Sequence, residues 1–173
     1  QVVLVSKDVN LRLKAKSLAI VAQDYFTDRV QDIDQLYMGK RAVHGFPGEL
    51  ISRFYQEADG IDPAQAGIGD LLPHEYCILK NGSKSVLAYH NPETGRLERI
   101  EKKPAFGILP RNAEQIFALH ALTRPGVLLV TLAGKAGTGK TLLALAAALE
   151  TSRQYRQVYL ARPIIPLSNR DMG

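Results

Sequence analysis

The run Val127-Leu128-Leu129-Val130-Thr131-Leu132-Ala133 leads into Gly134-Lys135-Ala136-Gly137-Thr138-Gly139-Lys140-Thr141, and an apolar stretch from Leu142 to Leu149 follows. The first segment is almost continuously apolar, as in a central parallel strand that helices cover on both faces. The last segment is apolar all round, which is typical of a buried helix. The glycine-rich segment between them has the spacing G-x-x-x-x-G-K-[ST], which predicts a phosphate-binding loop at a strand-to-helix junction.

The residue types in this loop suit the binding of phosphate. Glycines 134, 137 and 139 allow backbone conformations barred to other residues and bring amides close to phosphate oxygens. The helix that follows adds its unpaired amides and the positive end of its dipole. We expect Lys140 to reach the β- and γ-phosphates and Thr141 to ligate Mg²⁺. A glycine-rich turn with one exposed lysine is the alternative, but the flanking segments favour a complete nucleotide-binding loop: Gly134, Lys135, Ala136, Gly137, Thr138, Gly139, Lys140 and Thr141.

Composition restricts the class of protein. The 173 residues are enough for one ample domain or two small ones. The single cysteine, Cys77, excludes an internal disulfide framework and fits a reducing compartment. No apolar run approaches the roughly 18 residues of a membrane span, and no signal peptide is evident. A cytoplasmic protein without membrane contact is therefore the default expectation.

The net charge is +5 and is unevenly distributed. Residues 105–173 hold eight Lys and Arg against three acidic residues, so this part carries the whole excess. Because phosphate contacts dominate the affinity of proteins for nucleic acids, such a surface favours a polyanionic partner. A solvated basic surface together with the lysines of the loop explains the charge equally well.

The N-terminal residues predict a small α/β unit. Residues 2–5 form an apolar run typical of a short buried strand, and the composition of residues 9–16 favours a helix. Residues 20–25 predict another strand. Asp8 lies between strand and helix, at the edge of the sheet where α/β folds bind their ligands. Aspartate is also a favoured helix cap, so the residues alone leave both roles open for Asp8. The aspartates that follow fit solvated loop or cap positions: Asp24, Asp28, Asp32 and Asp34.

The run Val-Leu-Val-Ser-Lys-Asp-Val-Asn-Leu-Arg-Leu-Lys-Ala at residues 3–15 resembles the closing segment of a PIN nuclease domain. That family cuts RNA with a cluster of carboxylates that hold Mg²⁺ or Mn²⁺. The resemblance implies that Asp8 is a metal ligand and a catalytic residue. It matches the last carboxylate of such a cluster, and the other members would lie before Gln1.

The middle of the chain predicts a small β-rich connector. Residues 58–73 have no periodicity, while residues 75–101 read as a three-stranded meander with a type I′ turn at Asn81-Gly82 and a second turn at residues 91–95. A preceding amphipathic helix would present four side chains to a core: Leu50, Ile51, Phe54 and Tyr55. The basic residues of this region would either follow an RNA backbone or keep edge strands soluble: Lys80, Lys84, Arg96, Arg99, Lys102 and Lys103.

Three segments are together similar to the PhoH-like ATPases: Gly-Ile-Leu-Pro-Arg-Asn-Ala-Glu-Gln at residues 107–115, the phosphate loop, and Ala-Arg-Pro-Ile-Ile-Pro-Leu at residues 161–167. Their pairing with a PIN remnant looks like the PIN-PhoH fusion proteins, which couple ribonuclease activity to ATP-driven RNA unwinding. The resemblance implies ATP and Mg²⁺ as cofactors and RNA as a partner. It implies a homo-oligomer too, because helicase-like ATPases often need an arginine from a neighbour.

Two residues outside the loop gain roles from this resemblance. Gln115 corresponds to a glutamine that recognises adenine in helicase-type ATPases, and Arg162 lies where related helicases touch the nucleic-acid backbone. Both have simpler explanations. Asn112 and Gln115 have the spacing of a capping box, in which Gln115 reaches back to the Asn112 amide. A strand that ends before Pro163 explains Arg162.

The sequence therefore predicts an α/β protein with a truncated P-loop NTPase core of the RecA or helicase type. We assign residues 1–33 to the C-terminal end of a PIN-like domain, 34–104 to the connector and 105–173 to the N-terminal part of the ATPase. After Thr141 only Glu150 closes an apolar run, and it ends a helix rather than a strand, so completed ATP hydrolysis is expected only of a longer protein. The alternatives are a regulatory or chaperone-like ATPase with a degenerate PIN scaffold and a small-molecule kinase.

Overall fold

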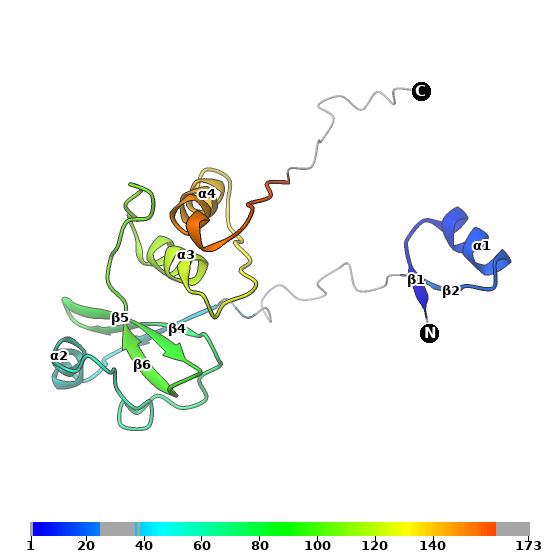
Figure 1. The fold of residues 1–173 in the computed structure, drawn as a ribbon. Helices are drawn as coiled ribbons and strands as arrows, with labels where there is room; N and C mark the ends of the chain where they lie inside the picture. The colour runs from blue at the N-terminus through cyan, green and yellow to red at the C-terminus, as the bar shows by residue number, and fades with distance from the viewer. Residues whose placement is uncertain (1, 25–36, 38, 162–173) are drawn as a thin grey trace. The chain divides into compact units, whose positions relative to one another are not determined.

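The computed structural model describes residues 2–24, 37 and 39–161. The chain divides into two compact units, unit 1 from Gln1 to Met38 and unit 2 from Gly39 to Gly173 (Figure 1). Both units combine helices with strands, which confirms the α/β fold class. Arg162 lies outside the described residues. None of the described helices is long and apolar enough to cross a membrane.

Unit 1 is a β-α-β element. Strands β1 (Val3–Val5) and β2 (Val21–Gln23) pair in parallel, and helix α1 (Val9–Ser17) connects them. The helix and the second strand were expected from the sequence. The expected burial of the first strand is wrong, because the side chains of Val3 and Val5 are exposed. Two strands and one helix do not provide a layer of structure on each face of the pair.

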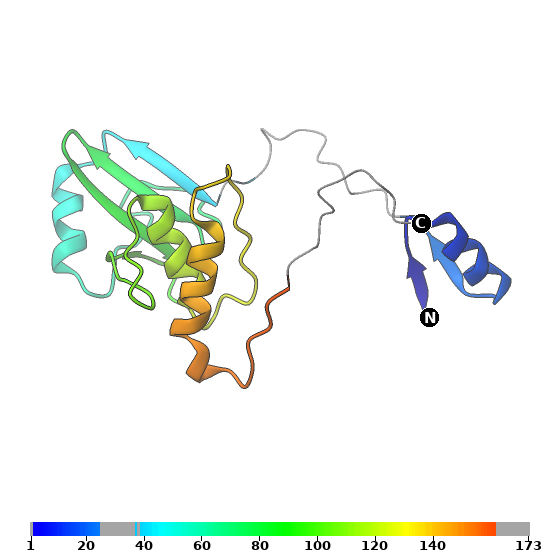
Figure 2. The same ribbon diagram turned by 90° about the horizontal axis from the view of Figure 1, so that it is seen from above.

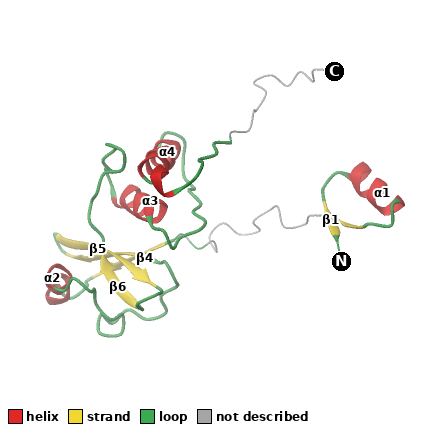
Figure 3. Cartoon of the chain, viewed as in Figure 1, coloured by secondary structure: helices red, strands yellow, loops and turns green. Residues whose placement is uncertain are grey.

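Unit 2 contains a four-stranded sheet in the order β3-β4-β5-β6. Figure 3 draws its strands in yellow. Strands β4 (Tyr76–Asn81), β5 (Lys84–Asn91) and β6 (Arg96–Arg99) form the expected antiparallel meander. Strand β3 (Lys40–His44), which the sequence analysis missed, pairs in parallel with β4. It is short and charged, and its partner lies far along the chain, so its own residues carry little strand signal.

The hairpin between β4 and β5 differs from the expected one by a single residue. Asn81 pairs with Lys84, so the loop consists of Gly82 and Ser83. Of these two residues only Gly82 has a positive φ, at 54°. A type I′ turn needs positive φ at both positions, so the geometry fits type II′ instead. The Asn81 side chain is used elsewhere, because its Nδ2 donates to the Phe46 carbonyl at 2.7 Å.

Helix α2 (Gly48–Gln56) covers one face of the sheet with Ile51 and Phe54, as predicted, but Tyr55 is 59% exposed and does not face inward. The irregular segment after α2 is part of this core rather than a mere connector. Gly60 has φ of +76°, and a Cβ there would lie 2.4 Å from the Leu97 carbonyl oxygen, so only glycine fits this position. The buried residues of this face are Phe46, Ile51, Phe54, Ile61, Ala66, Ile68, Cys77, Leu79, Val86, Ala88 and Leu97.

Helices α3 (Ala113–Thr123) and α4 (Lys140–Glu150) lie on the opposite face of the sheet, with α3 between the sheet and α4 (Figure 2). Alternate residues of a strand point to opposite faces, so Tyr76 and Tyr89 contact α3 through Phe117. On its other side α3 packs against α4 through small and apolar residues: Ala105, Leu119, Leu143, Ala146 and Ala147. A short 3₁₀ turn, η2 (Ser152–Gln154), follows α4.

The strand expected at residues 127–133 is absent, and so is a strand immediately before Arg162. Leu128 and Leu129 are 97% and 82% exposed. A buried parallel strand needs neighbouring strands and helices on both faces, and the described residues supply no strand beside this segment. Helix α4 is likewise buried on one face only, because three of its leucines are exposed: Leu142, Leu145 and Leu149.

Candidate nucleotide-binding site

The predicted phosphate loop has the backbone that its glycines allow. Gly134, Gly137 and Gly139 have φ of 153°, 78° and 89°, all in the region that favours glycine. Helix α4 begins directly at Lys140, with Gly139 as its left-handed N-cap. The unpaired amides of the first helical turn therefore adjoin the loop, and the positive end of the helix dipole lies there too.

The Lys140 side chain is folded back over the loop. Its Nζ donates to the carbonyl oxygens of Gly134 at 2.9 Å and Lys135 at 2.7 Å, and it lies 3.4 Å from Thr138 Oγ1. The Thr138 hydroxyl in turn donates to the Lys135 carbonyl at 2.9 Å. These bonds hold the Lys140 ammonium against the backbone of the phosphate loop. The neighbouring Thr141, in the first turn of α4, has an exposed side chain.

The Gln115 side chain connects the start of α3 to the phosphate loop. Its Nε2 donates to the Thr138 carbonyl at 3.3 Å, and its Oε1 accepts from the Arg111 amide at 2.8 Å. Asn112 caps α3 as expected by accepting from the Gln115 amide at 2.9 Å. The alternative, a return of the glutamine to the Asn112 amide, is not formed, because the Gln115 side chain accepts from the Arg111 amide instead. A Cβ at Gly139 would lie 3.4 Å from Gln115 Nε2, so the loop and the glutamine approach closely.

A pocket of about 270 Å³ opens between α3 and the phosphate loop. From the α3 side it is lined by Asn112, Glu114, Gln115 and Ala118, and from the loop side by Gly134, Thr138 and Lys140. Glycines that bring amides close to an anion, a lysine ammonium, a threonine hydroxyl and a helix N-terminus suit a nucleoside triphosphate and its Mg²⁺. The residues present therefore fit these two groups.

Glu114 is a residue of this pocket that sequence reasoning missed. It lies in the first turn of α3, where a negative charge is favourable, and it accepts a hydrogen bond from the Lys40 ammonium of β3. That hydrogen bond is the main cause of its lowered pKa, and the Glu114 backbone amide adds to the effect. Its position directly before Gln115 was the only sequence signal for it.

Asp8 acts as the N-cap of α1. Its Oδ1 accepts from the amides of Asn10 at 2.8 Å and Leu11 at 3.1 Å. Asp24 follows β2 and so lies at the same edge of the parallel pair, where it forms an ion pair with Arg12 at 3.2 Å. Among the described residues no group of three or more His, Cys, Asp or Glu could hold a metal ion. The structure thus shows the cap, and the metal role stays a prediction.

Two of the basic residues that might follow RNA are engaged within unit 2. Arg96 donates to the Gly60 carbonyl at 2.7 Å, and the Arg99 guanidinium lies 4.8 Å from the centre of the Tyr55 ring. Both interactions join β6 to the segment around α2. They support a structural role for these two arginines.

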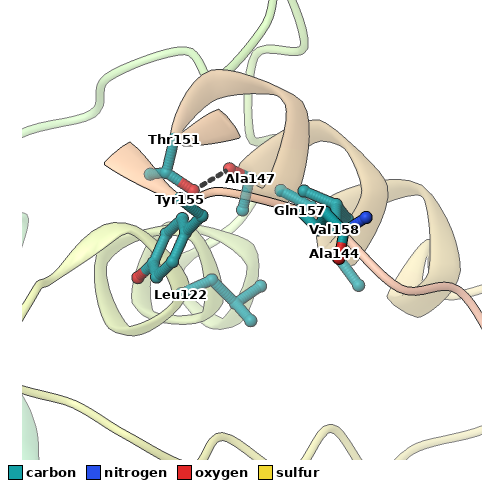
Figure 4. A pocket seen from close by; sticks show the side chains of 8 residues that line it. Leu122, Ala144, Ala147, Thr151, Tyr155, Gln157 and Val158 are labelled. Atoms are coloured by element: carbon teal, nitrogen blue, oxygen red, sulfur yellow. Dashed lines mark hydrogen bonds between the residues drawn. The ribbon is translucent and has the colours of Figure 1, made fainter. Parts of the chain in front are cut away.

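A second pocket, of about 250 Å³, lies beside α3 and α4 (Figure 4). Its walls are mainly apolar and include Leu122, Ala144, Tyr155 and Val158. The Thr151 hydroxyl bonds to the Ala147 carbonyl at 2.9 Å and is therefore already satisfied. The pocket has no charged lining residue and offers no chemistry comparable to that of the loop.

Two family models and several known proteins match parts of this chain. Residues 107–173 match the family described as PhoH-like protein, and residues 1–26 match the PIN domain family. Protein PhoH2 of Bacillus subtilis is 37% identical over 185 residues, covering 99% of this chain and 40% of that protein. The PhoH2 proteins of Thermobispora bispora and Mycolicibacterium smegmatis are each 36% identical over 176 residues, covering 99% of this chain and 39% of each protein.

The chain thus spans about two fifths of the length of these relatives. No solved structure matches it significantly. The relatives match almost the whole chain, and the two family matches lie at its opposite ends. The chain is therefore similar to PhoH-like proteins over residues 107–173 and to PIN domains over residues 1–26, and nearly its whole length is similar to the PhoH2 proteins.

Proposed function

We propose that this chain is the ATP-binding part of an ATP-dependent RNA helicase that is coupled to a PIN-type ribonuclease. The observation that carries the proposal is the junction of loop and helix. Three glycines with positive φ lead directly into α4, and the Lys140 ammonium is held at the mouth of the loop. This arrangement concentrates amides and positive charge where a triphosphate needs them.

Each part of the site has a proposed task. The loop amides and Lys140 would hold the phosphates, and the Thr141 hydroxyl would hold Mg²⁺. The bound Mg²⁺ and ATP supply the phosphoryl chemistry. Lys140 donates to the carbonyl oxygens of Gly134 and Lys135, and phosphate oxygens would replace these acceptors. Gln115 keeps one N–H and one lone pair beyond its present bonds, which suits the edge of adenine.

The nuclease activity would depend on Asp8. A carboxylate has more acceptor sites than the two cap bonds use, so the cap does not prevent metal ligation. A Mg²⁺ or Mn²⁺ ion held there would activate a water for attack on the phosphodiester. The ion would require further carboxylates from elsewhere in the protein.

RNA is the proposed partner. The excess positive charge of residues 105–173 supports it, and we assign a backbone contact to Arg162, which lies outside the described residues. A homo-oligomer would provide an arginine from a neighbouring copy to the nucleotide site. We place this activity in the cytoplasm, in line with the single cysteine.

A second candidate is a nucleotide-binding regulatory ATPase with a degenerate, non-nucleolytic PIN scaffold. One observation favours it: Asp8 is satisfied as a helix cap, while Asp24 is neutralised by Arg12. Under this alternative the nucleotide site is unchanged and only the nuclease activity is lost.

Lys140→Ala in the intact protein tests the nucleotide site. We expect ATPase activity to fall by orders of magnitude, because the variant lacks the cation that faces the phosphates. The free energy of unfolding should change by only about 1 kcal/mol, since the lysine makes hydrogen bonds but packs no core. Lys16→Ala, at an exposed position of α1, is the matched control and should keep wild-type turnover. Near-normal turnover by Lys140→Ala would refute the assignment.

A further inference from the structure

Glu114 places a carboxylate in the same pocket as the phosphate loop. The pocket is lined by Glu114 and Gln115 at the start of α3 and by Lys140 on the loop side. The Glu114 side chain is 54% exposed, and its Oε1 accepts from the Lys40 ammonium of β3. Two elements far apart in sequence therefore hold one acidic group beside a site built for a polyanion.

The Glu114 carboxylate is ready to accept hydrogen bonds. The hydrogen bond from Lys40 lowers its pKa, and so does the Glu114 backbone amide, so the group is ionised at neutral pH. An ionised carboxylate has about four lone-pair sites and no donor, and Lys40 contacts only Oε1. Lys40 also offsets a negative charge that would otherwise repel a triphosphate.

Because the Glu114 carboxylate can only accept hydrogen bonds, it suits a part of the nucleotide that donates them. Phosphates repel a carboxylate, and the ring nitrogens beside the adenine amino group do so as well. The 2′ and 3′ hydroxyls of ribose are two adjacent donors, which match the acceptors of a carboxylate. Acidic residues recognise ribose hydroxyls in this way in dinucleotide-binding folds.

We propose that Glu114 accepts hydrogen bonds from the ribose hydroxyls of the bound nucleotide and makes the site selective for ribonucleotides. Lys40 is a positioning residue that holds and neutralises this carboxylate. The inference rests on the proposed ATP-binding function and adds a sugar contact to it. It also gives the small sheet a part in nucleotide binding, because Lys40 belongs to β3.

Titration calorimetry of the intact protein with ATP and with 2′,3′-dideoxy-ATP tests this contact. The wild type should bind ATP at least about tenfold more tightly, the scale of hydrogen bonds to a charged group. Glu114→Gln should bring this ratio close to one by weakening the binding of ATP, without weakening the binding of the dideoxy nucleotide. Glu101→Gln, which removes another ion-paired exposed carboxylate, is the matched control and should keep the ratio.

Lys40→Met separates the sugar contact from the ion pair. This variant keeps the carboxylate but lacks the cation that holds and neutralises it, so both nucleotides should bind more weakly and the ratio between them should become smaller while staying above one. The inference is overturned if Glu114→Gln weakens both nucleotides equally or leaves the ratio unchanged, or if Lys40→Met abolishes the ratio. Absence of ATP binding by the wild type would overturn the nucleotide function as well.

Discussion

The three hydrogen bonds of Gln115 separate its structural role from its proposed role in adenine recognition. The bond from its side chain to the Thr138 carbonyl supports the phosphate loop, which every nucleotide would use equally. A contact with adenine would affect ATP and not GTP, because guanine presents two acceptors where adenine presents a donor and an acceptor. The two roles therefore predict different nucleotide preferences rather than different affinities.

Gln115→Glu tests adenine recognition. The glutamate can still accept from the Arg111 amide, so the melting temperature should change little. It cannot donate to the Thr138 carbonyl, and this loss should weaken ATP and GTP alike. Recognition predicts an additional loss of ATP preference of about 1 to 3 kcal/mol in competition binding. An unaltered ratio of ATP to GTP would leave Gln115 as a support for the loop alone.

Asp8 presents the same problem in unit 1, where a cap is visible and a metal role is proposed. Asp8→Asn keeps an oxygen that can accept from the Asn10 and Leu11 amides but removes the charge a metal ion needs. In the intact protein we expect loss of Mg²⁺- or Mn²⁺-dependent RNA cleavage and nearly unchanged thermal stability. Cleavage at the wild-type rate would identify Asp8 as a cap only and favour the regulatory ATPase.

Helix α3 connects the nucleotide pocket to the sheet through a half-buried histidine. Nδ1 of His120 lies 3.0 Å from the Tyr76 hydroxyl, and the imidazole ring is 4.9 Å from the Tyr89 ring. Burial lowers the pKa of His120 to about 4, and the nearby charge of Arg124 adds to this effect, while Glu98 opposes it. The folded state therefore favours the neutral imidazole.

This shift predicts how the stability of unit 2 depends on pH. The folded pKa, about 4, lies below the ordinary value of 6.5, so between these values the unfolded chain binds a proton that the folded chain does not. The contribution of His120 is complete above pH 6.5 and falls by about 3 kcal/mol as the pH drops toward 4. Chemical unfolding at several pH values should show a shallower acid loss for His120→Gln than for the wild type. An equal loss of stability toward low pH in the wild type and in His120→Gln would contradict the lowered pKa of His120.

Elements whose signals are local were predictable from the sequence. Helix α1 has its cap in the preceding residue, and the meander has turn residues between apolar runs. Strand β3 was not predictable, because it depends on a parallel partner distant in the chain. The same reason explains why residues 127–133 do not form the expected strand. Their apolar pattern is strand-like, but the pattern cannot state whether neighbouring strands are present.

The candidate site likewise has parts that follow from local sequence and parts that depend on distant segments. The loop and the start of α4 follow from the spacing of glycine, lysine and threonine, which belongs to one short segment. The contact between Lys40 and Glu114 joins β3 to α3, and it appears only when the sheet has formed. Gly60 is similar, since its close approach to the Leu97 carbonyl depends on the packing of two segments.

At the scale of the whole molecule, charge is the property that bears on RNA binding. The net charge of +5 comes from residues 105–173, but a basic surface exposed to solvent gives the same count. Arg96 and Arg99, which lie before this region, are engaged within unit 2. Arg153 and Arg156, by contrast, are exposed in the segment after α4. These two side chains are therefore suited to test whether the excess charge contacts RNA.

RNA binding through phosphates should depend steeply on salt. Each neutralised phosphate of a single strand adds about −0.7 to the slope of log affinity against log salt, so two or three contacts imply a roughly tenfold loss between about 50 and 200 mM. Replacing both Arg153 and Arg156 by alanine should lower the affinity of the intact protein for single-stranded RNA and flatten that slope. Lys16→Ala should do neither, because it lies in unit 1. Binding that is independent of salt, or equal effects of the two variants, would show that the basic surface only serves solubility.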